Sequence, residues 1–241
     1  MGTVAIYGRM AVLEALADPA TTVSLVLLAR TARGDTVDEI VQLAAGRDIP
    51  LKRVAPEKVT RVSGNGRHDQ GVVAEVEAPS LVELDEWLGA NRPGSLLVLD
   101  GVTNPQNVGM IVRTATAAGI DGVVLPRAGA PDVGPLMVKA SAGVAFRATI
   151  LSCGTAVEGL RALTAAGAEI VGMRTGADDL FTSTLPDAAA YVLGSEHAGV
   201  SPAVAALVTT WRSIPLASGV DSLNVAVAAG ILAYELARRR A

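Results

Sequence analysis

Three segments in the second half of the chain combine glycines with polar side chains in a way that suits a small polar ligand. The segments are 104–113, 193–202 and 214–230. Glycine lets the backbone approach a ligand closely, and a guanidinium, a carboxylate, a hydroxyl and amides can together orient a phosphate or a sugar. Each segment by itself also fits an ordinary capped helix or turn. The candidate side chains are Asn107, Arg113, Glu196, Ser222 and Asn224.

Several common catalytic patterns are missing from the sequence. The turn at 100–109 lacks the Gly-x-Gly-x-x-Gly of dinucleotide-binding folds, and no phosphate loop, Gly-x-Ser-x-Gly elbow or His-Glu-x-x-His pair occurs. His68, His197 and the single cysteine, Cys153, are too few for a multi-histidine or multi-cysteine metal centre on one chain. We therefore expect no metal, and nicotinamide oxidoreduction is a weak alternative.

The composition indicates a folded protein. Of 241 residues, 50% are apolar, 18% are charged and only 3% are aromatic, which favours α/β layers packed with Ala, Val and Leu. No apolar run reaches the roughly 18–20 residues of a membrane span, and the N-terminus lacks the apolar core of a signal peptide. A lone cysteine suits a reducing compartment. These features predict a cytoplasmic protein without a membrane segment.

The net charge of −4 gives no overall attraction to nucleic acid, so RNA or DNA binding would need a local patch. One stretch, 47–67, has a surplus of basic residues. An ordinary solvated loop face explains such a cluster about equally well. Its basic residues are Arg47, Lys52, Arg53, Lys58, Arg61 and Arg67, against the acidic Asp48 and Glu57.

The order of apolar and polar stretches predicts two α/β domains. Residues 1–77 are expected to form a small α/β domain. Residues 78–94, with a short helical stretch at 81–88 followed by the breakers of 91–94, are expected to be a linker. Residues 95–241 alternate apolar strands with helices, which predicts a parallel sheet covered on both faces. Expected N-caps are Asn107 and either Asp221 or Ser222. Expected helices are 7–17, 36–45, 108–118, 155–166 and 222–239, with a helical turn at 56–62; expected strands are 23–28, 51–54, 71–76, 95–99, 122–125, 168–172, 191–193 and 211–216.

The order and spacing of the three segments resembles the motifs of the SpoU (TrmH) family of the SPOUT superfamily, which are S-adenosylmethionine-dependent RNA 2′-O-ribose methyltransferases. Segments 99–103 and 139–143 are also similar to this family, and 6–16 and 68–74 resemble its ribosomal-protein-like substrate-binding domain. The two-domain plan resembles bacterial enzymes that methylate a guanosine ribose in large-subunit ribosomal RNA. The motifs read Asn107-x-Gly109-x-x-x-Arg113, Leu193-Gly194-x-Glu196-x-x-Gly199-x-Ser201, and Ile214-Pro215-Leu216 followed by Ser222-Leu223-Asn224-Val225.

The resemblance implies a C-terminal parallel-sheet SPOUT domain with a deep trefoil knot and a small N-terminal domain that binds RNA. It also implies S-adenosylmethionine as cofactor and a homodimer with active sites at the subunit interface. In such a site the main chain at Gly194, Ile214 and Leu223 meets the cofactor's adenine and ribose, and Leu193 and Leu216 are apolar walls. The RNA-binding candidates are Arg9, Lys52, Arg53, Lys58, Arg61 and Arg67.

The resemblance gives Arg113 the central catalytic role. Because a guanidinium has a pKa above about 12, it is a poor base. Our hypothesis is that Arg113 holds the adjacent RNA phosphate and stabilises the developing alkoxide, while a phosphate or water takes the proton. Asn107, Ser222 and Asn224 would orient ribose and phosphate, and Glu196 would hold the knot loop in place.

Three other functions stay open at this point. The same fold could methylate a tRNA ribose or an RNA base, or the protein could be a non-catalytic RNA-binding factor in ribosome assembly that uses the basic patch alone.

The sequence departs from the family pattern at three places. Leu216 stands where Met is commoner, Asp69 is an extra residue, and Phe146-Arg147-Ala148 replaces a more usual apolar-Pro stretch. Small residues at 226, 229, 230 and 233 suit close helix packing, either between subunits or within the chain.

Overall fold

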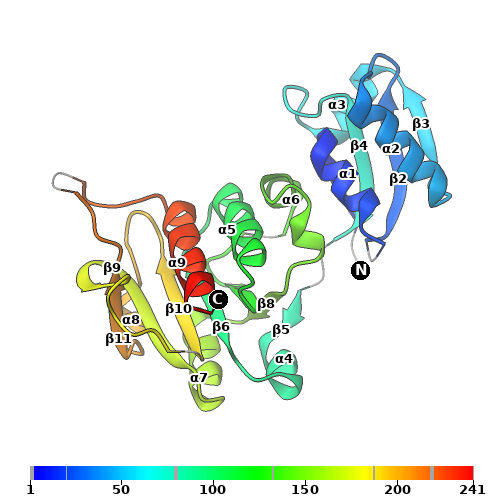
Figure 1. Cartoon of the computed structure of the whole chain (residues 1–241). Helices are drawn as coiled ribbons and strands as arrows, with labels where there is room; N and C mark the ends of the chain where they lie inside the picture. The colour runs from blue at the N-terminus through cyan, green and yellow to red at the C-terminus, as the bar shows by residue number, and fades with distance from the viewer. Residues whose placement is uncertain are drawn as a thin grey trace. The chain divides into compact units, whose positions relative to one another are not determined.

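The computed structural model of the chain describes residues 3–19, 21–78, 81–131, 133–186, 188–217 and 220–240. The chain divides into two compact units (Figure 1). Unit 1 combines Met1–Ser80 with Val133–Arg147, and unit 2 combines Leu81–Asp132 with Ala148–Ala241.

Unit 1 is built on a four-stranded sheet in the order β1-β4-β2-β3, in which only β2 and β3 pair in parallel. The expected helix at 7–17 begins only at Arg9, because the preceding residues form a strand that the sequence analysis missed. Ile6 and Tyr7 are buried in this strand, which pairs with β4. The elements are β1 (Thr3–Tyr7), α1 (Arg9–Ala17), β2 (Val23–Ala29), α2 (Asp35–Gly46), β3 (Leu51–Val54), α3 (Pro56–Ser63), β4 (Val72–Glu77), α6 (Pro135–Ala140) and the 3-10 helix η1 (Val144–Phe146).

The segment 133–147 packs with unit 1, although the sequence analysis placed it in the domain 95–241. Lys139 donates from Nζ to the carbonyl of His68 at 2.8 Å and lies over the Tyr7 ring, 4.8 Å from its centroid. Arg147 pairs with Glu14 at 2.9 Å. Burial lowers the pKa of Lys139. These contacts are far apart in sequence, so local patterning carries no signal for them.

Unit 2 is a seven-stranded sheet in the order β11-β9-β10-β6-β7-β8-β5, and all its strand pairs are parallel. This is the architecture that the alternation of apolar strands and helices predicts. The elements are β5 (Val82–Glu83), α4 (Leu84–Ala90), β6 (Ser95–Asp100), α5 (Pro105–Ala117), β7 (Gly122–Pro126), β8 (Ile150–Cys153), α7 (Ala156–Ala165), β9 (Glu169–Asp179), β10 (Ala189–Gly194), α8 (Pro202–Ala205), β11 (Thr210–Ser213) and α9 (Val225–Arg240).

Helices cover both faces of this sheet, which explains why its central strands are apolar without alternation. On one face, Leu96, Val98 and Val192 form a core with Leu160 and Leu163 of α7. Successive strand residues point to opposite faces, so their neighbours in β6 and β10 are buried on the other side, where α5 and α9 pack against each other and against β7 and β10 (Figure 1).

Three local expectations need correction. Residues 81–94 do not behave as a linker, because β5 pairs with β8 and Leu84 is buried in the core of unit 2. The cap of α5 is Asn104, whose side chain accepts from the backbone N–H of Gln106, so Asn107 lies inside the helix. The helix at the C-terminus begins at Val225, and Asn224 caps it by accepting from the N–H of Ala226 at 2.9 Å.

The basic end of α9 is held within unit 2. Glu235 is buried and accepts from both Arg238 and Arg239, and these hydrogen bonds lower its pKa to about 2. Arg239 also donates to the carbonyl of Leu180 at 2.8 Å, and Arg240 to that of Gly119 at 2.8 Å. These arginines therefore anchor the helix to its own unit.

Within the described ranges, no helix is long and apolar enough to cross a membrane. The same residues contain no group of three or more His, Cys, Asp or Glu side chains that could hold a metal ion.

Candidate functional site

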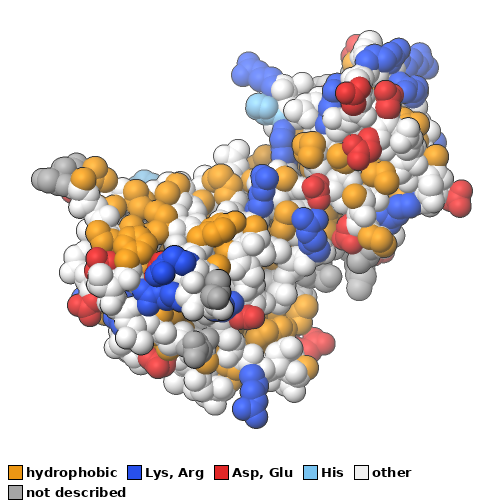
Figure 2. Space-filling view, in the orientation of Figure 1, with side chains coloured by type: hydrophobic (Ala, Val, Ile, Leu, Met, Phe, Trp, Pro, Cys, Tyr) orange, Lys and Arg blue, Asp and Glu red, His pale blue; other side chains and the backbone are white. Residues whose placement is uncertain are grey.

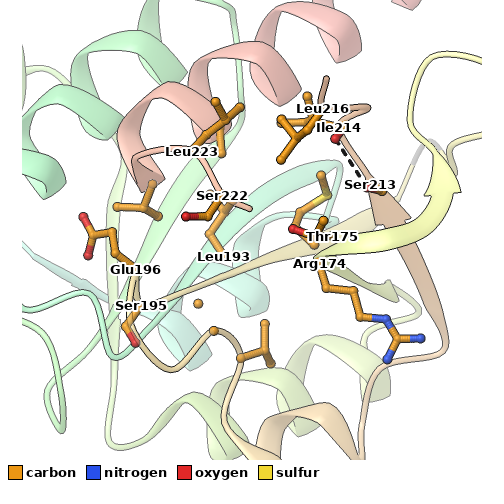
Figure 3. Close-up of a pocket in the computed structure, with 16 residues that line it drawn as sticks. Arg174, Thr175, Leu193, Ser195, Glu196, Ser213, Ile214, Leu216, Ser222 and Leu223 are labelled. Carbon is orange, nitrogen blue, oxygen red and sulfur yellow. Dashed lines mark hydrogen bonds between the residues drawn. The ribbon is translucent and has the colours of Figure 1, made fainter. Parts of the chain in front are cut away.

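A cavity of about 230 Å³ lies at the carboxyl ends of β10 and β11, beside residues 173–175 of β9 (Figure 3). The carboxyl ends of parallel strands are the usual place for a ligand in an open α/β sheet. Two of the three segments singled out from the sequence meet here. All five predicted cofactor residues line the cavity, together with two of the predicted catalytic residues: Leu193, Gly194, Ile214, Leu216, Leu223, Glu196 and Ser222.

The turn after β10 presents Glu196 to this cavity. Ser195 and Gly199 exchange backbone hydrogen bonds of 3.1 and 2.9 Å, and Gly199 has a φ of 65°. A side chain at Gly194 would overlap the backbone of Gly199 and Val200. Glycine at 194 is therefore a steric requirement for the close return of the chain.

A hydrogen-bond network joins the third segment to the other two. Asn224 donates from Nδ2 to Oδ1 of Asn107 at 3.2 Å, and Asn107 donates from Nδ2 to Oε1 of Glu196. Asn107 is only 5% exposed. It does not line the cavity, but it contacts Glu196, which does. Residues about ninety positions apart or more in the sequence thus share one network.

The partners at the two ends of the network fix its direction. The carboxylate of Glu196 can only accept, so Asn107 must present its NH₂ group to it and its oxygen to Asn224. At the other end, the oxygen of Asn224 accepts from the first backbone N–H groups of α9. Each amide therefore has one orientation. The network holds together the start of α9, the first turn of α5 and the turn after β10.

Arg113 is not at this cavity within one chain. It lies on an exposed face of α5 with Met110 and Ala117, and it makes no hydrogen bond or ion pair with any residue that the structure describes. The opposite face of α5 is buried by the sheet and α9. The structure thus groups four of the five predicted catalytic residues and leaves the arginine apart from them.

The contribution of β9 to the cavity was not predicted from the sequence. Met173, Arg174 and Thr175 line the cavity, and the hydroxyl of Thr175 donates to the carbonyl of Asp221 at 3.1 Å. A signal was present in the sequence, because Arg174 and Thr175 come just after the apolar run 168–172 that was expected to be a strand.

Most of the predicted RNA-binding residues are exposed on unit 1. Arg9 is half-buried and donates to Gln70 from its backbone and its side chain. Figure 2 shows basic side chains gathered at the end of unit 1 where Figure 1 places α3 and β3. The exposed set is Lys52, Arg53, Lys58, Arg61 and Arg67.

Two residues near this patch have structural roles instead. The guanidinium of Arg47, which the charge count included, donates to the carbonyls of Leu16 and Thr21 at 2.8 and 2.7 Å, so it ties the end of α2 to the last turn of α1 and to the chain that follows it. The extra Asp69 is buried and accepts from Thr60, and also from the N–H of Gly71. Asp69 therefore holds the turn before β4 rather than contacting a ligand.

Two family models match the chain. The model of the SpoU rRNA Methylase family matches residues 94–234, and a model for RNA 2′-O ribose methyltransferase substrate binding matches residues 5–82. Together the two models match parts of both units. Unit 1 carries the RNA-binding candidates, and unit 2 carries the catalytic and cofactor-binding candidates.

Named relatives agree with these matches. The chain is 32% identical to the 23S rRNA (guanosine-2′-O-)-methyltransferase RlmB of Ralstonia nicotianae, over 98% of this chain and 95% of the relative. It is 34% identical to an uncharacterised tRNA/rRNA methyltransferase of Mycolicibacterium smegmatis, over 98% of this chain and 76% of the relative. The crystal structure of the SpoU methyltransferase AviRb from Streptomyces viridochromogenes with AdoMet is similar with a TM-score of 0.81 and 25% identity, covering 99% of this chain and 91% of that one. This chain therefore belongs to the SpoU rRNA methylase family.

Proposed function

We propose that this protein transfers the methyl group of S-adenosylmethionine to a ribose 2′-hydroxyl of 23S ribosomal RNA, at a guanosine, in the cytoplasm. The observation that carries the proposal is the network of Asn224, Asn107 and Glu196, which joins the three motif segments beside one cavity. Membership of the SpoU family, and the relative named as a 23S rRNA guanosine methyltransferase, support the substrate.

The cavity suits S-adenosylmethionine. Leu193, Ile214, Leu216 and Leu223 offer apolar walls for a purine ring. The backbone N–H groups of Ile214, Leu216 and Leu223 donate to no group within the described residues, so they are available to a ligand. Bound there, S-adenosylmethionine supplies a methyl group on a positively charged sulfur.

The chain's own residues would position the ribose and stabilise charge. In-line placement of the attacking oxygen can contribute about 7–11 kcal/mol in favourable cases. Asn107 and Asn224 hold Glu196 and the start of α9 in one arrangement, and Ser222 presents a hydroxyl to the cavity. Arg113 would bind the phosphate beside the target ribose and stabilise the oxygen as its proton leaves to a phosphate or water.

The position of Arg113 supports a homodimer as the active form. Arg113 shares its exposed surface with Met110 on α5, and the adjacent α9 exposes Val227 and Tyr234 at 51% and 56%. Figure 2 shows hydrophobic side chains on the face where Figure 1 places α5 and α9. We propose that two copies pair through this face, so that Arg113 of one subunit serves the cavity of the other.

The small-residue face of α9 has a different role from this pairing surface. Ala226, Ala229 and Ala233 are buried, and a side chain at Gly230 would lie 3.4 Å from Thr114 of α5. The contact within the chain therefore accounts for these small residues.

Tyr234→Glu is expected to convert the dimer to a monomer, because it buries a charge in the proposed apolar contact. Light scattering coupled to gel filtration measures the mass. Met10→Glu, at a residue that is 52% exposed on unit 1, is the matched control and should leave the mass unchanged. A wild-type monomer would overturn the pairing.

We also propose that the chain between β11 and α9 threads a trefoil knot with the turn after β10. The contacts of Thr175 with Asp221 and of Asn224 with Asn107 support this, because they hold Asp221 against β9 and Asn224 against α5.

Mapping of the methylated position tests the function. Ribosomal RNA from cells lacking the protein is incubated with the purified protein and S-adenosylmethionine and then digested with alkali. A 2′-O-methyl group blocks cleavage of the next phosphodiester, so a protected site is expected. A methylated nucleotide that alkali still cleaves would indicate base methylation. Methylation found only in tRNA would show that the substrate is tRNA and not ribosomal RNA. Absence of cofactor binding in calorimetry would favour the non-catalytic alternative.

Neutralising the basic patch is expected to weaken RNA binding and flatten its salt dependence. A variant with Lys52, Arg53, Lys58 and Arg61 changed to Ala loses the contacts that release counterions, with the slope of log K against log salt falling by about 0.7–0.9 per lost contact. Cofactor affinity should stay constant. Replacing the exposed Arg92 and Arg161 of unit 2 is the control. An unchanged slope in the patch variant would remove the patch from RNA binding.

A further inference from the structure

Beside the cavity, the pairing between strands β9 and β11 is interrupted. Gly172 pairs with Trp211, but the next residue of β11, Arg212, pairs with Asp178, so residues 173–177 lie outside the pairing. The pairing of β9 with β10 also ends at Gly172. This excursion brings Arg174 and Thr175 onto the cavity wall (Figure 3).

Trp211 holds the side chain of Arg174 in place. The guanidinium carbon of Arg174 lies 4.5 Å from the centroid of the Trp211 ring, which is a cation–π contact. The indole in turn lies against Gly172, where a side chain would come within 2.6 Å of the ring. A guanidinium that is already held loses less freedom when it binds a ligand.

The N–H donors of Arg174 have no acceptor among the described residues. Apart from the stacking, Arg174 has no hydrogen bond or ion pair with any described residue, whereas its neighbour Arg212 contacts Asp178 and the carbonyl of Thr184. A guanidinium offers five N–H donors in a fork that matches a carboxylate. Arg174 is thus an arginine with a fixed ring contact and an open hydrogen-bonding edge at a ligand cavity.

The charges at the cavity are divided between its two sides. Among its lining residues, Arg174 carries the only positive side chain and Glu196 the only negative one. Figure 3 shows them on opposite sides, with Arg174 extending outward from the wall. Glu196 already accepts from Asn107 and would repel a second carboxylate. A ligand anion is therefore favoured on the side of Arg174, and a ligand cation on the side of Glu196.

We infer that Arg174 is the residue that recognises the carboxylate at the amino-acid end of the cofactor, and that it sets the orientation of the cofactor in the cavity. The inference rests on the proposed function, because it takes S-adenosylmethionine as the ligand. Pairing at Arg174 keeps the carboxylate at the solvent-facing rim and leaves the positive sulfur toward Glu196 and the Asn107 network. The stack on Trp211 makes Arg174 a positioning group of fixed direction.

Calorimetry with two ligands tests the inference. S-adenosylhomocysteine keeps the amino-acid end, whereas 5′-methylthioadenosine has the same nucleoside and sulfur without it. Arg174→Ala is expected to lower the affinity for S-adenosylhomocysteine about tenfold, because a charge-assisted pair is lost. The affinity for 5′-methylthioadenosine should stay unchanged. The affinity of Arg174→Lys for S-adenosylhomocysteine should lie between those of the wild-type protein and Arg174→Ala. Arg161→Ala, an exposed arginine on α7, is the matched control and should change neither affinity.

Trp211 provides a second readout that does not depend on binding. In a Trp87→Phe background Trp211 is the remaining tryptophan, and Arg174→Ala should change its fluorescence because the stacked cation is lost. With that change observed, equal losses of affinity for both ligands, or no loss for either, would overturn the inference. Weaker RNA binding with unchanged affinity for S-adenosylhomocysteine would also overturn it and assign Arg174 to RNA. If the wild-type protein binds neither ligand, the proposed function itself fails.

Discussion

Arg113→Lys should lower the rate of methyl transfer by about 10²–10³ and leave the affinity for S-adenosylmethionine unchanged. This magnitude is that of removing one well-placed donor that stabilises a developing negative charge. Lysine keeps the charge but loses the two-pronged geometry that matches a phosphate. Because Arg113 is exposed and lies outside the cavity, its replacement leaves the proposed cofactor-binding residues in place.

Single-turnover methylation at saturating cofactor measures the rate, and calorimetry with S-adenosylhomocysteine measures the affinity. Arg92→Lys, at another exposed arginine of unit 2, should match the wild-type protein in both. A rate within about twofold of wild type for Arg113→Lys would remove the guanidinium from the mechanism. A loss of cofactor affinity that accounts for the lower rate would instead place Arg113 among the cofactor-binding groups.

The sequence predicted five of the seven strands of unit 2 because their signal is local, whereas β5 and β8 were not predicted. The inner residues of β6, 96–99, and of β10, 189–193, form unbroken runs of apolar or aromatic residues, as strands buried on both faces require, and each run is followed by a polar or glycine-rich turn. The motif spacing also led to residues that meet at one cavity. Periodicity and turn chemistry are sufficient for such features because they depend on neighbours in the chain.

The errors lie where distant residues decide the structure. Asn107 looks like a helix cap in sequence, but Asn104 takes that position and frees Asn107 to contact Glu196, which is far away in the chain. Arg174 carried no motif, and its significance depends on Trp211 in the neighbouring strand. The attachment of 133–147 to unit 1 rests on pairs such as Lys139 with His68. None of these contacts leaves a period or spacing in the sequence.

Gly194→Ala should abolish measurable cofactor binding, with an affinity loss of at least about 100-fold. The added methyl would overlap the backbone of Gly199 and Val200, so the turn that carries Glu196 must move away from the cavity. Backbone cannot yield as a flexible side chain does, and displaced walls lose both apolar contact and hydrogen-bond geometry. Calorimetry with S-adenosylhomocysteine measures the loss. Gly89→Ala, where a methyl meets no atom within 4 Å, is the matched control.

A mixed dimer of the two variants separates action within one subunit from action across the interface. If Arg113 serves the partner's cavity, a dimer of one Arg113→Lys chain and one Gly194→Ala chain contains one site with an intact cavity and an intact arginine. It should recover about half of the wild-type activity, although each parent dimer is nearly inactive. Recovery requires only that the Gly194→Ala chain folds well enough to supply its arginine.

A second cavity variant keeps this test decisive. Leu223→Asp places a charge among the apolar walls without touching the turn at Gly199, and it should complement Arg113→Lys to the same extent. If neither mixed dimer exceeds its parents while both retain the mass of a dimer, the arginine acts in its own subunit. In that case α5 or the turn after β10 must move when RNA binds, because Arg113 and the cavity are separate in the single chain.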